Sequence, residues 1–329
     1  MSVAQRVLVT GANGFIGQAL LPLLIEEGFD VVAGTRNGAA VNGSTGGLAL
    51  GDMADANWSA PELDGINSVV HLAAIAHRTG VDAQAYEQVN AQAPIRLAEA
   101  AAVANCDRFI FLSTAKVLGD VSPPGGAFTD QSAPNPPDDY AKAKLAAETQ
   151  IEAVARNTDM TAISLRPPLV HGPKPSGNLA KLIAVINQGG VSPLRLPLPL
   201  GNTANHRSLI GRESLCRAIV MALKHPAPTA GRYLFADQPA ISTSDLLKAL
   251  AAGLGKSAPL INFSPRLLDT ILRLLGRGGM SDRLLGNFVV ESDGFQQHYG
   301  WEPDADTIAA LKSMAAEQAQ HLQNQGADR

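Results

Sequence analysis

Short apolar runs alternate with longer amphipathic stretches along the first half of the chain. The apolar runs predict strands at 6–10, 30–35, 47–52, 68–74, 108–114 and 161–170. Apolar residues at helical spacing predict helices at 15–28, 85–105 and 138–157. Because such apolar strands alternate with helices, we predict a doubly wound α/β fold, with a parallel sheet covered by helices on both faces.

The pattern changes beyond residue 170, where proline and glycine become frequent and predict a loop-rich lobe with several helices. One of these is the stretch SPRLLDTILRLLGR, in which Ser264 is a suitable N-cap and Pro265 a suitable first helical residue. Its apolar face is wide, and arginines flank it. We expect this helix to pack on the lobe; an alternative is that it rests on a membrane surface.

Composition and charge exclude several classes of function. The chain has 329 residues and a net charge of −4, which argues against a nucleic-acid partner. Its apolar runs are too short for stable membrane insertion, and the N-terminus enters a strand without a signal peptide. Two cysteines and seven histidines show no metal or redox spacing, so we expect no metal site. These features favour a cytoplasmic protein with reduced thiols.

The sequence VLVTGANGFIG places Gly11, Gly14 and Gly17 between the first predicted strand and the first helix. The first glycine allows a tight turn, the second lets the backbone approach a pyrophosphate, and the third lets the helix pack closely on the sheet. The helix N-terminus favours the phosphate charge. In this context the glycines predict a Rossmann dinucleotide-binding domain over residues 1–165. Residues 166–329 then form mainly a smaller substrate-binding lobe, with parts that pack back on the first domain.

Tyr140 and Lys144 are spaced i, i+4 in the helix predicted at 138–157, so they share one face. A nearby ammonium stabilises a phenolate and lowers the pKa of the tyrosine, which can then exchange a proton with a sugar or alcohol oxygen. The strand at 108–114 ends in Ser113 and Thr114, at the edge of the sheet that lines the ligand crevice. A hydroxyl group there can bind the same substrate oxygen.

The chain resembles a known family in several segments taken together. TGANGFIG, GDMAD, HLAA, FLSTAKVLGD, YAKAK and RPPLVHGP have the order and spacing of extended short-chain dehydrogenase/reductases, the nucleotide-sugar epimerase, dehydratase and reductase group. The later segments LPLPLGNTANHRSLI and SDRLLGNFVVESDGFQQHYGWEP are most similar to bacterial UDP-N-acetylhexosamine 4-ketoreductases and UDP-glucose 4-epimerase-like proteins. Two positions depart from the common pattern: Leu118 and His171 each replace a tyrosine, and His171 is expected to pack rather than act as a base.

The resemblance implies roles for individual residues. Thr114 matches the catalytic hydroxyl, Tyr140 the general acid/base, and Lys144 the lysine that binds the nicotinamide ribose. Residues implied to contact the cofactor are Gly11, Asn13, Gly14, Phe15, Ile16, Gly17, Arg36, Asp52, Met53, Leu72, Ala73, Ala74, Lys144 and Pro167. Residues implied to contact the substrate are Ser113, Lys116, Asn178, Arg207 and Arg283, although Lys116 is equally well explained as a solvated charge. Family members often dimerise through helices that correspond to 85–105 and 138–157.

The second predicted strand ends in VVAGTRN, so Thr35 and Arg36 stand where NAD-binding proteins usually present an acid. A neutral Thr35 does not repel a 2′-phosphate, and Arg36 can pair with one. We therefore expect NADP(H) in preference to NAD(H). A reductase must renew its nicotinamide from the reduced pool, whereas an epimerase returns the hydride to its substrate. The sequence thus favours a reductase of a 4-keto nucleotide sugar, with a UDP-sugar 4-epimerase or a non-catalytic NADP-binding protein as alternatives.

Overall fold

The computed structural model describes residues 4–55, 58–76, 80–175, 177–191, 194–304 and 306–327. Its main sheet has seven strands in the order β3-β2-β1-β4-β5-β6-β9, and all neighbouring strands are parallel. The strands are β1 (Arg6–Thr10), β2 (Asp30–Thr35), β3 (Gly46–Ala49), β4 (Ser68–His71), β5 (Arg108–Leu112), β6 (Thr161–Arg166) and β9 (Gly231–Leu234). This arrangement confirms the predicted Rossmann-type fold. The strand order reverses between β1 and β4, where such sheets bind their ligands.

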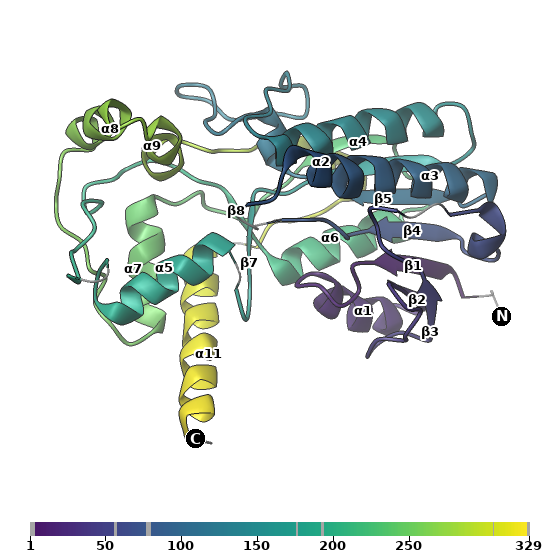
Figure 1. Cartoon of the computed structure of the whole chain (residues 1–329), viewed down its shortest axis with the longest axis horizontal. Coiled ribbons are helices and arrows are strands. Elements are labelled where there is room, and N and C mark those ends of the chain that lie inside the picture. The colour runs from purple at the N-terminus through teal and green to yellow at the C-terminus, as the bar shows by residue number, and fades with distance from the viewer. Residues whose placement is uncertain are drawn as a thin grey trace.

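Helices cover both faces of this sheet (Figure 1). On one face α1 (Gly17–Glu26) and α6 (Arg212–Lys224) pack on Val7, Val9 and other alternate strand residues. On the opposite face α3 (Ala93–Val103) and α4 (Asp139–Ala155) pack on the strand residues that point the other way, such as Leu8. Both faces of the strands are therefore buried, which explains why their sequences read as continuous apolar runs.

Several predicted boundaries differ from the observed ones. The strand predicted at 161–170 is two strands, β6 and β7 (Leu169–His171), because Pro167 and Pro168 between them lack the N–H groups that a sheet needs. The helix predicted at 85–105 consists of α2 (Ala83–Tyr86), a π-helical segment η2 (Glu87–Gln92) and α3. The 3₁₀ helices η1 (Ala60–Leu63) and η3 (Ala115–Leu118) were not predicted.

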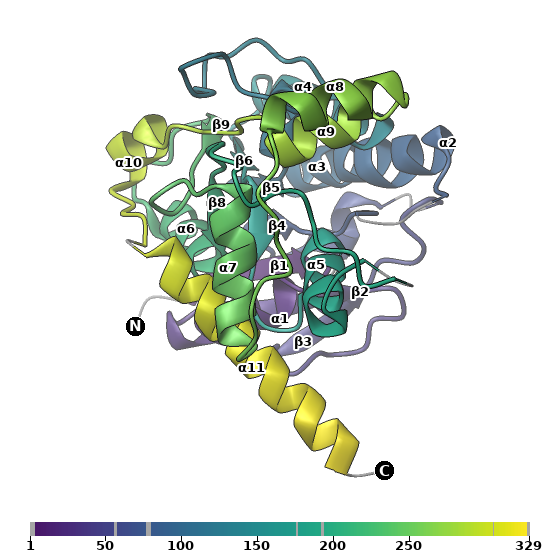
Figure 2. The same cartoon turned by 90° about the vertical axis from the view of Figure 1, so that its left-hand side faces the viewer.

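The second half of the chain builds a lobe beside the carboxyl ends of the strands (Figure 2). A two-stranded parallel sheet joins β7 to β8 (Leu209–Gly211). A separate apolar core unites α5 (Gly177–Gln188), α7 (Thr243–Gly253) and α11 (Thr307–Ala327). β9 and α6 also come from this half, yet they pack on the main sheet. The division near residue 165 stays a prediction.

Two helices form a hairpin at the outer end of this lobe, α8 (Pro265–Leu274) and α9 (Gly278–Leu285), and α10 (Asp293–Tyr299) follows. The predicted cap of α8 is confirmed, because the Ser264 hydroxyl accepts a hydrogen bond from the amide of Leu267. The expectation that this helix packs on the lobe is correct only for one side of the helix. Leu268 contacts the core of the lobe, but no residue of α8 is buried.

Candidate active site

The glycine loop between β1 and α1 has no room for side chains. Gly11 has φ +68°, and a Cβ there would lie 2.8 Å from the amide nitrogen of Ala73. A Cβ on Gly17 would lie 2.4 Å from the carbonyl oxygen of Gly11. Ile16, the N-cap residue of α1, makes no side-chain capping hydrogen bond. The amides of Gln18 and Ala19 bond the carbonyl oxygens of Gly14 and Ile16, so an anion at this helix N-terminus would bind the amides that precede them. The loop therefore fits the pyrophosphate of a dinucleotide.

The ring of Phe15 lies on the other side of this loop, against the second half of the chain. The guanidinium carbon of Arg212 lies 5.2 Å from the centre of that ring. A Cβ on Gly172 would come within 3.2 Å of the same ring. Phe15, which the resemblance assigns to the cofactor, thus also joins the glycine loop to the start of α6.

The carboxyl end of β4 is held beside the glycine loop by buried polar groups. The Thr10 hydroxyl lies 3.0 Å from Nδ1 of His71 and accepts a hydrogen bond from the amide of Ala73 at 3.2 Å. Burial lowers the pKa of His71 to about 3, so its ring is neutral near neutral pH. Two residues after Ala73, the backbone of Ile75 makes two hydrogen bonds with the side-chain amide of Asn90. These contacts fix the HLAA segment, with Leu72, Ala73 and Ala74, beside the glycine loop.

Arg36 and Asp52, two residues assigned to the adenosine end of the cofactor, form an ion pair with 3.3 Å between Nη2 and Oδ2. Both side chains are largely exposed, at 79% for Arg36 and 50% for Asp52. The Thr35 hydroxyl donates to the carbonyl oxygen of Ala39. The end of β2 therefore presents a cation shared with one acid, and no carboxylate of its own.

Lys144 is buried beneath the end of β5. Its Nζ donates a hydrogen bond to the carbonyl oxygen of Leu112 at 2.8 Å and lies 4.5 Å from the centre of the Phe111 ring. Burial lowers the pKa of Lys144 to about 7, and Glu148 acts in the opposite direction. The lysine is thus anchored to Leu112, a residue that precedes Thr114 by two positions.

Tyr140 lies one helical turn before Lys144, with its ring packed edge-on against Tyr86 at 6.1 Å between ring centres. The pKa of Tyr140 is raised, first by burial and then by the charge of Asp138. The sequence argument predicted a lowered pKa, and this direction is wrong for the structure described here. The Nζ of Lys144 bonds the Leu112 carbonyl, and burial lowers the pKa of Lys144 as well, so the lysine does not offset the burial of the phenol.

Thr114 and its neighbours form the turn that follows β5. The Thr114 hydroxyl accepts a hydrogen bond from the amide of Lys116 at 3.2 Å and caps η3. The amide of Ala115 donates to the carbonyl oxygen of Pro167 at 2.9 Å, which places Pro167 beside this turn. The hydroxyl of Ser113 is buried and has no hydrogen-bond partner in the described part of the chain. Both hydroxyl groups therefore stand where the sequence placed them, at the carboxyl end of β5.

Lys116 forms an ion pair with Asp138, the N-cap residue of α4, and lies 3.8 Å from Asp120. Asp138 also accepts a hydrogen bond from the amide of Ala141. These contacts tie η3 to the first turn of the helix that carries Tyr140. Lys116 therefore contributes to the geometry of the site, and its contact with a substrate stays a prediction.

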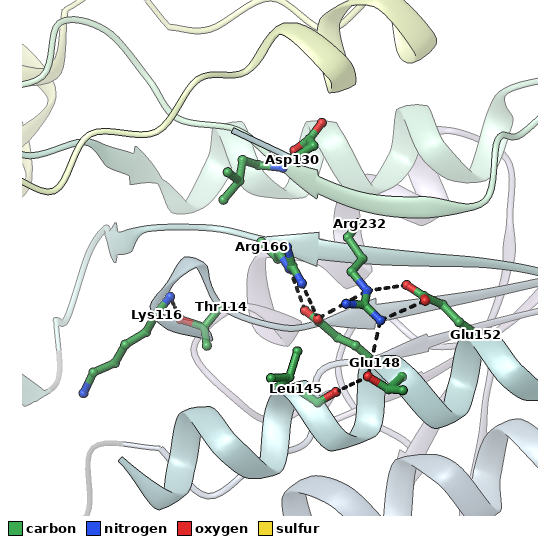
Figure 3. A network of polar contacts seen from close by, with 10 residues as sticks. Thr114, Lys116, Asp130, Leu145, Glu148, Glu152, Arg166 and Arg232 are labelled. Carbon is green, nitrogen blue, oxygen red and sulfur yellow. Dashed lines mark hydrogen bonds and ion pairs between the residues drawn. The ribbon is translucent and has the colours of Figure 1, made fainter. Parts of the chain in front are cut away.

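A buried charge network lies behind these residues (Figure 3). Arg166 on β6 makes two hydrogen bonds to the carboxylate of Glu148 on α4, at 2.9 and 2.6 Å, and both side chains are almost fully buried. Arg232 on β9 pairs with Glu152 and lies 3.7 Å from Glu148. The network fixes α4 against the sheet, and with it the turn that carries Lys144.

The C-terminal lobe places Arg207 within the electrostatic influence of Arg283. The guanidinium of Arg207 donates to the carbonyl oxygen of Gly286 at 3.1 Å and lies 5.6 Å from the centre of the Phe288 ring. Burial lowers the pKa of Arg207; Asp120 acts in the opposite direction, and Arg283 on α9 in the same one. Asn178, in the first turn of α5, is exposed.

Sequence reasoning missed two asparagines that shape the site. Asn90 holds the segment after β4, and Asn205 bonds Thr243 and the carbonyl oxygen of Gly286, the same oxygen that Arg207 binds. Asn90 stands among Glu87, Gln88 and Gln92, so its sequence context does not single it out. His171 is buried with a pKa lowered to about 4 by desolvation, which suits a packing residue and not a base.

Two further findings concern the described residues as a group. They contain no group of three or more His, Cys, Asp or Glu side chains placed to hold a metal ion. Within the same ranges no helix is both long and apolar enough to cross a lipid bilayer.

The sequence of the chain matches a known protein family. Residues 7–234 match the model of the NAD dependent epimerase/dehydratase family. A UDP-glucose 4-epimerase of Vibrio cholerae is 31% identical over 319 residues, covering 94% of each chain.

Solved structures agree at the level of the fold. A UDP-glucuronic acid 4-epimerase from Bacillus cereus in complex with NAD has a TM-score of 0.75 and 22% identity, covering 96% of both chains. WbmG of Bordetella bronchiseptica in complex with NAD and UDP has a TM-score of 0.73 and 18% identity, covering 97% of this chain and 96% of its own. The match over most of the chain shows that this protein belongs to the NAD dependent epimerase/dehydratase family.

Proposed function

We propose that this protein is an NADP(H)-dependent reductase of a 4-keto nucleotide sugar, of the UDP-linked N-acetyl-6-deoxyhexosamine type, in the synthesis of surface polysaccharide precursors. The observation that carries this proposal is the end of β2. Thr35 is neutral and bonds the carbonyl oxygen of Ala39, and Arg36 is 79% exposed. A 2′-phosphate meets no carboxylate on this strand and can pair with the guanidinium.

The residues around the glycine loop suit the remainder of the cofactor. Gly11, Gly14 and Gly17 keep the loop free of side chains where a pyrophosphate would bind at the start of α1. Asp52 and Met53 would flank the adenine. Ala73 and Ala74 would line the cofactor site, and Pro167 would lie beside the nicotinamide. When bound there, a reduced nicotinamide supplies the hydride that reduces a carbonyl carbon.

The acid–base residues suit reduction. The raised pKa of Tyr140 keeps its phenol protonated, so it is ready to give a proton to the substrate oxygen. The Thr114 hydroxyl already accepts a hydrogen bond from Lys116, so its own proton is available for the same oxygen. One proton of Lys144 is bound to the Leu112 carbonyl, and the others can orient the nicotinamide ribose.

The substrate end is assigned to the lobe. We infer that Arg207 and Arg283 bind the diphosphate of the sugar nucleotide, with Asn178 near the same group. The carbonyl oxygen of Gly286 and the ring of Phe288 hold Arg207 in place, which preorganises one of the two cations.

A UDP-sugar 4-epimerase with bound NAD is the second candidate function. A specific observation favours it: the Vibrio cholerae relative is a UDP-glucose 4-epimerase, and the two structural neighbours were solved with NAD. The same Thr114, Tyr140 and Lys144 would serve both reactions. A non-catalytic role is less consistent with this chain, because all three residues are present.

One experiment separates the two enzymes. The purified full chain is incubated with a UDP-linked 4-keto-6-deoxy-N-acetylhexosamine and NADPH, and the loss of reduced nicotinamide is followed together with the sugar product. A reductase consumes one NADPH for each product formed. In parallel, UDP-glucose and UDP-N-acetylglucosamine are incubated with the protein as purified. Epimerisation without added cofactor, and no consumption of NADPH with the keto sugar, would overturn the proposal in favour of the epimerase.

A further inference from the structure

Helix α8 has its polar side turned toward its neighbouring helix and its apolar side turned outward. The carboxylate of Asp269 accepts a hydrogen bond from the Ser281 hydroxyl of α9 at 2.6 Å. Arg273, one turn later on the same side, pairs with both Asp269 and Asp282. These contacts hold the polar side of α8 against α9, so the opposite side of the helix cannot pack there.

That opposite side is apolar and exposed. Leu267, Ile271 and Leu274 follow one another at helical spacing, and their exposed fractions are 51%, 38% and 82%. Leu275, next to them, is 67% exposed. These four residues are among the thirteen most exposed large apolar side chains of the described residues. Figure 2 looks onto this end of the molecule, where α8 and α9 lie across the outside of the lobe. A cluster of this kind marks an interaction surface.

The charge of the hairpin identifies the partner. Residues 264–286 contain four arginines, two aspartates and neither lysine nor glutamate, a net charge of +2 in a chain whose total is −4. Within the described residues, Arg266 and Arg277 have no ion-pair partner. Both long side chains can extend past the helix to an anionic surface while the leucines enter an apolar one.

We propose that the α8–α9 hairpin docks this protein on the surface of an anionic lipid bilayer, with α8 lying in the plane of the interface. The apolar side of α8 enters the boundary between headgroups and acyl chains, and Arg266 and Arg277 bind lipid phosphates. A second copy of the chain is a poorer partner, because a two-fold contact through α8 sets one positively charged hairpin against another. The fixed contacts between α8 and α9 present a formed helix to the bilayer, with no cost for folding it there.

The test is co-sedimentation of the full chain with phosphatidylcholine vesicles that contain or lack phosphatidylglycerol, at low and at high salt. We expect the protein to bind the anionic vesicles at low salt. Its affinity for vesicles of phosphatidylcholine alone should be lower by about tenfold or more. The double substitution Leu274→Ser and Leu275→Ser should reduce binding by about tenfold or more, because it removes the two most exposed leucines of the hairpin. Val103→Ser on α3 is the matched control, since Val103 is also exposed, at 71%, and should bind as the wild type does.

Two results would overturn the proposal. One is that the wild type stays in the supernatant with anionic vesicles at low salt. The other is that the double leucine variant binds them as tightly as the wild type does. Sedimentation velocity on the same samples distinguishes self-association: a dimer that the leucine variant dissociates, with no vesicle binding, would assign the face to a second copy.

Discussion

Arg36 and Asp52 face each other across the carboxyl ends of β2 and β3, with 3.3 Å between guanidinium and carboxylate. An exposed pair of this kind contributes little to stability, at most about 1 kcal/mol. Its effect is on what can bind beside it, because the guanidinium is already positioned at the edge where the adenosine end of a dinucleotide is expected. We therefore attribute to Arg36 a role in selecting the cofactor and not in holding the fold.

The glycine loop gives the first prediction. Gly17→Ala should lower the free energy of unfolding by about 1–3 kcal/mol and weaken nicotinamide binding, because the new Cβ must displace the Gly11 carbonyl or move α1. Urea denaturation and cofactor titration measure the two effects. Gly46→Ala on β3 is the control, since a Cβ there meets nothing within 4 Å. Equal stability of the two variants would mean that the close approach at Gly17 is not a constraint.

The buried pair of Glu148 and Arg166 gives the second prediction. Glu148→Gln should lower the free energy of unfolding by about 3–5 kcal/mol, because it leaves the buried guanidinium without its charged partner. Replacing both residues by apolar ones should recover much of that loss. Lys142→Ala, which removes an exposed pair with Asp139, serves as the control and should change stability by less than about 1 kcal/mol. A Glu148→Gln variant as stable as this control would contradict the assignment.

Lys144 gives a prediction for pH dependence. Its pKa is about 7 in the folded chain and 10.5 as the ordinary value, so from pH 7 to 10 the unfolded chain holds a proton that the folded chain has released. Stability of the wild type should therefore rise with pH in this window, relative to Lys144→Met, by on the order of 1 kcal/mol per pH unit. Urea denaturation of both proteins at several pH values measures this difference. A constant difference across the window would mean that Lys144 keeps its ordinary pKa.

Arg207 gives a prediction for substrate binding. Arg207→Gln should raise the KM for a sugar nucleotide by about tenfold or more, because a cation held by Gly286 is lost from the diphosphate site. The affinity for the nicotinamide cofactor should not change. Arg217→Gln removes an exposed arginine paired with Asp304 and should leave both values unchanged. A wild-type KM in the Arg207 variant would remove this residue from the substrate site.

Local patterns predicted the fold well because each depends on residues near one another in the chain. The glycines before α1, the apolar strands and the spacing of Tyr140 and Lys144 are all of this kind. The direction of the pKa shift of Tyr140 could not be predicted from such local patterns, because burial and the charge of Asp138 decide it. The contact of Glu148 with Arg166 and Arg232 requires that α4, β6 and β9 lie together, which only the folded chain shows.

The same limit explains the helix at 265–274. Its sequence shows an apolar and a polar side, and the usual expectation is that the apolar side faces the protein. The bonds from Asp269 and Arg273 to α9 reverse this arrangement. Those partners lie in the next helix of the hairpin, so the orientation depends on how the two helices meet and not on the periodicity of either.

The most direct test of the central claim is a fluorescence titration of wild type and Arg36→Gln with NADPH and with NADH, after removal of any cofactor bound on purification. We predict that the wild type binds NADPH about tenfold or more tightly than NADH, and that Arg36→Gln loses this preference by weakening NADPH binding alone. Arg6→Gln is the matched control. Arg6 lies at the amino end of β1, whereas Arg36 follows the carboxyl end of β2, so this variant should behave as the wild type. Equal affinities for the two cofactors in the wild type would contradict the claim and direct attention to the epimerase.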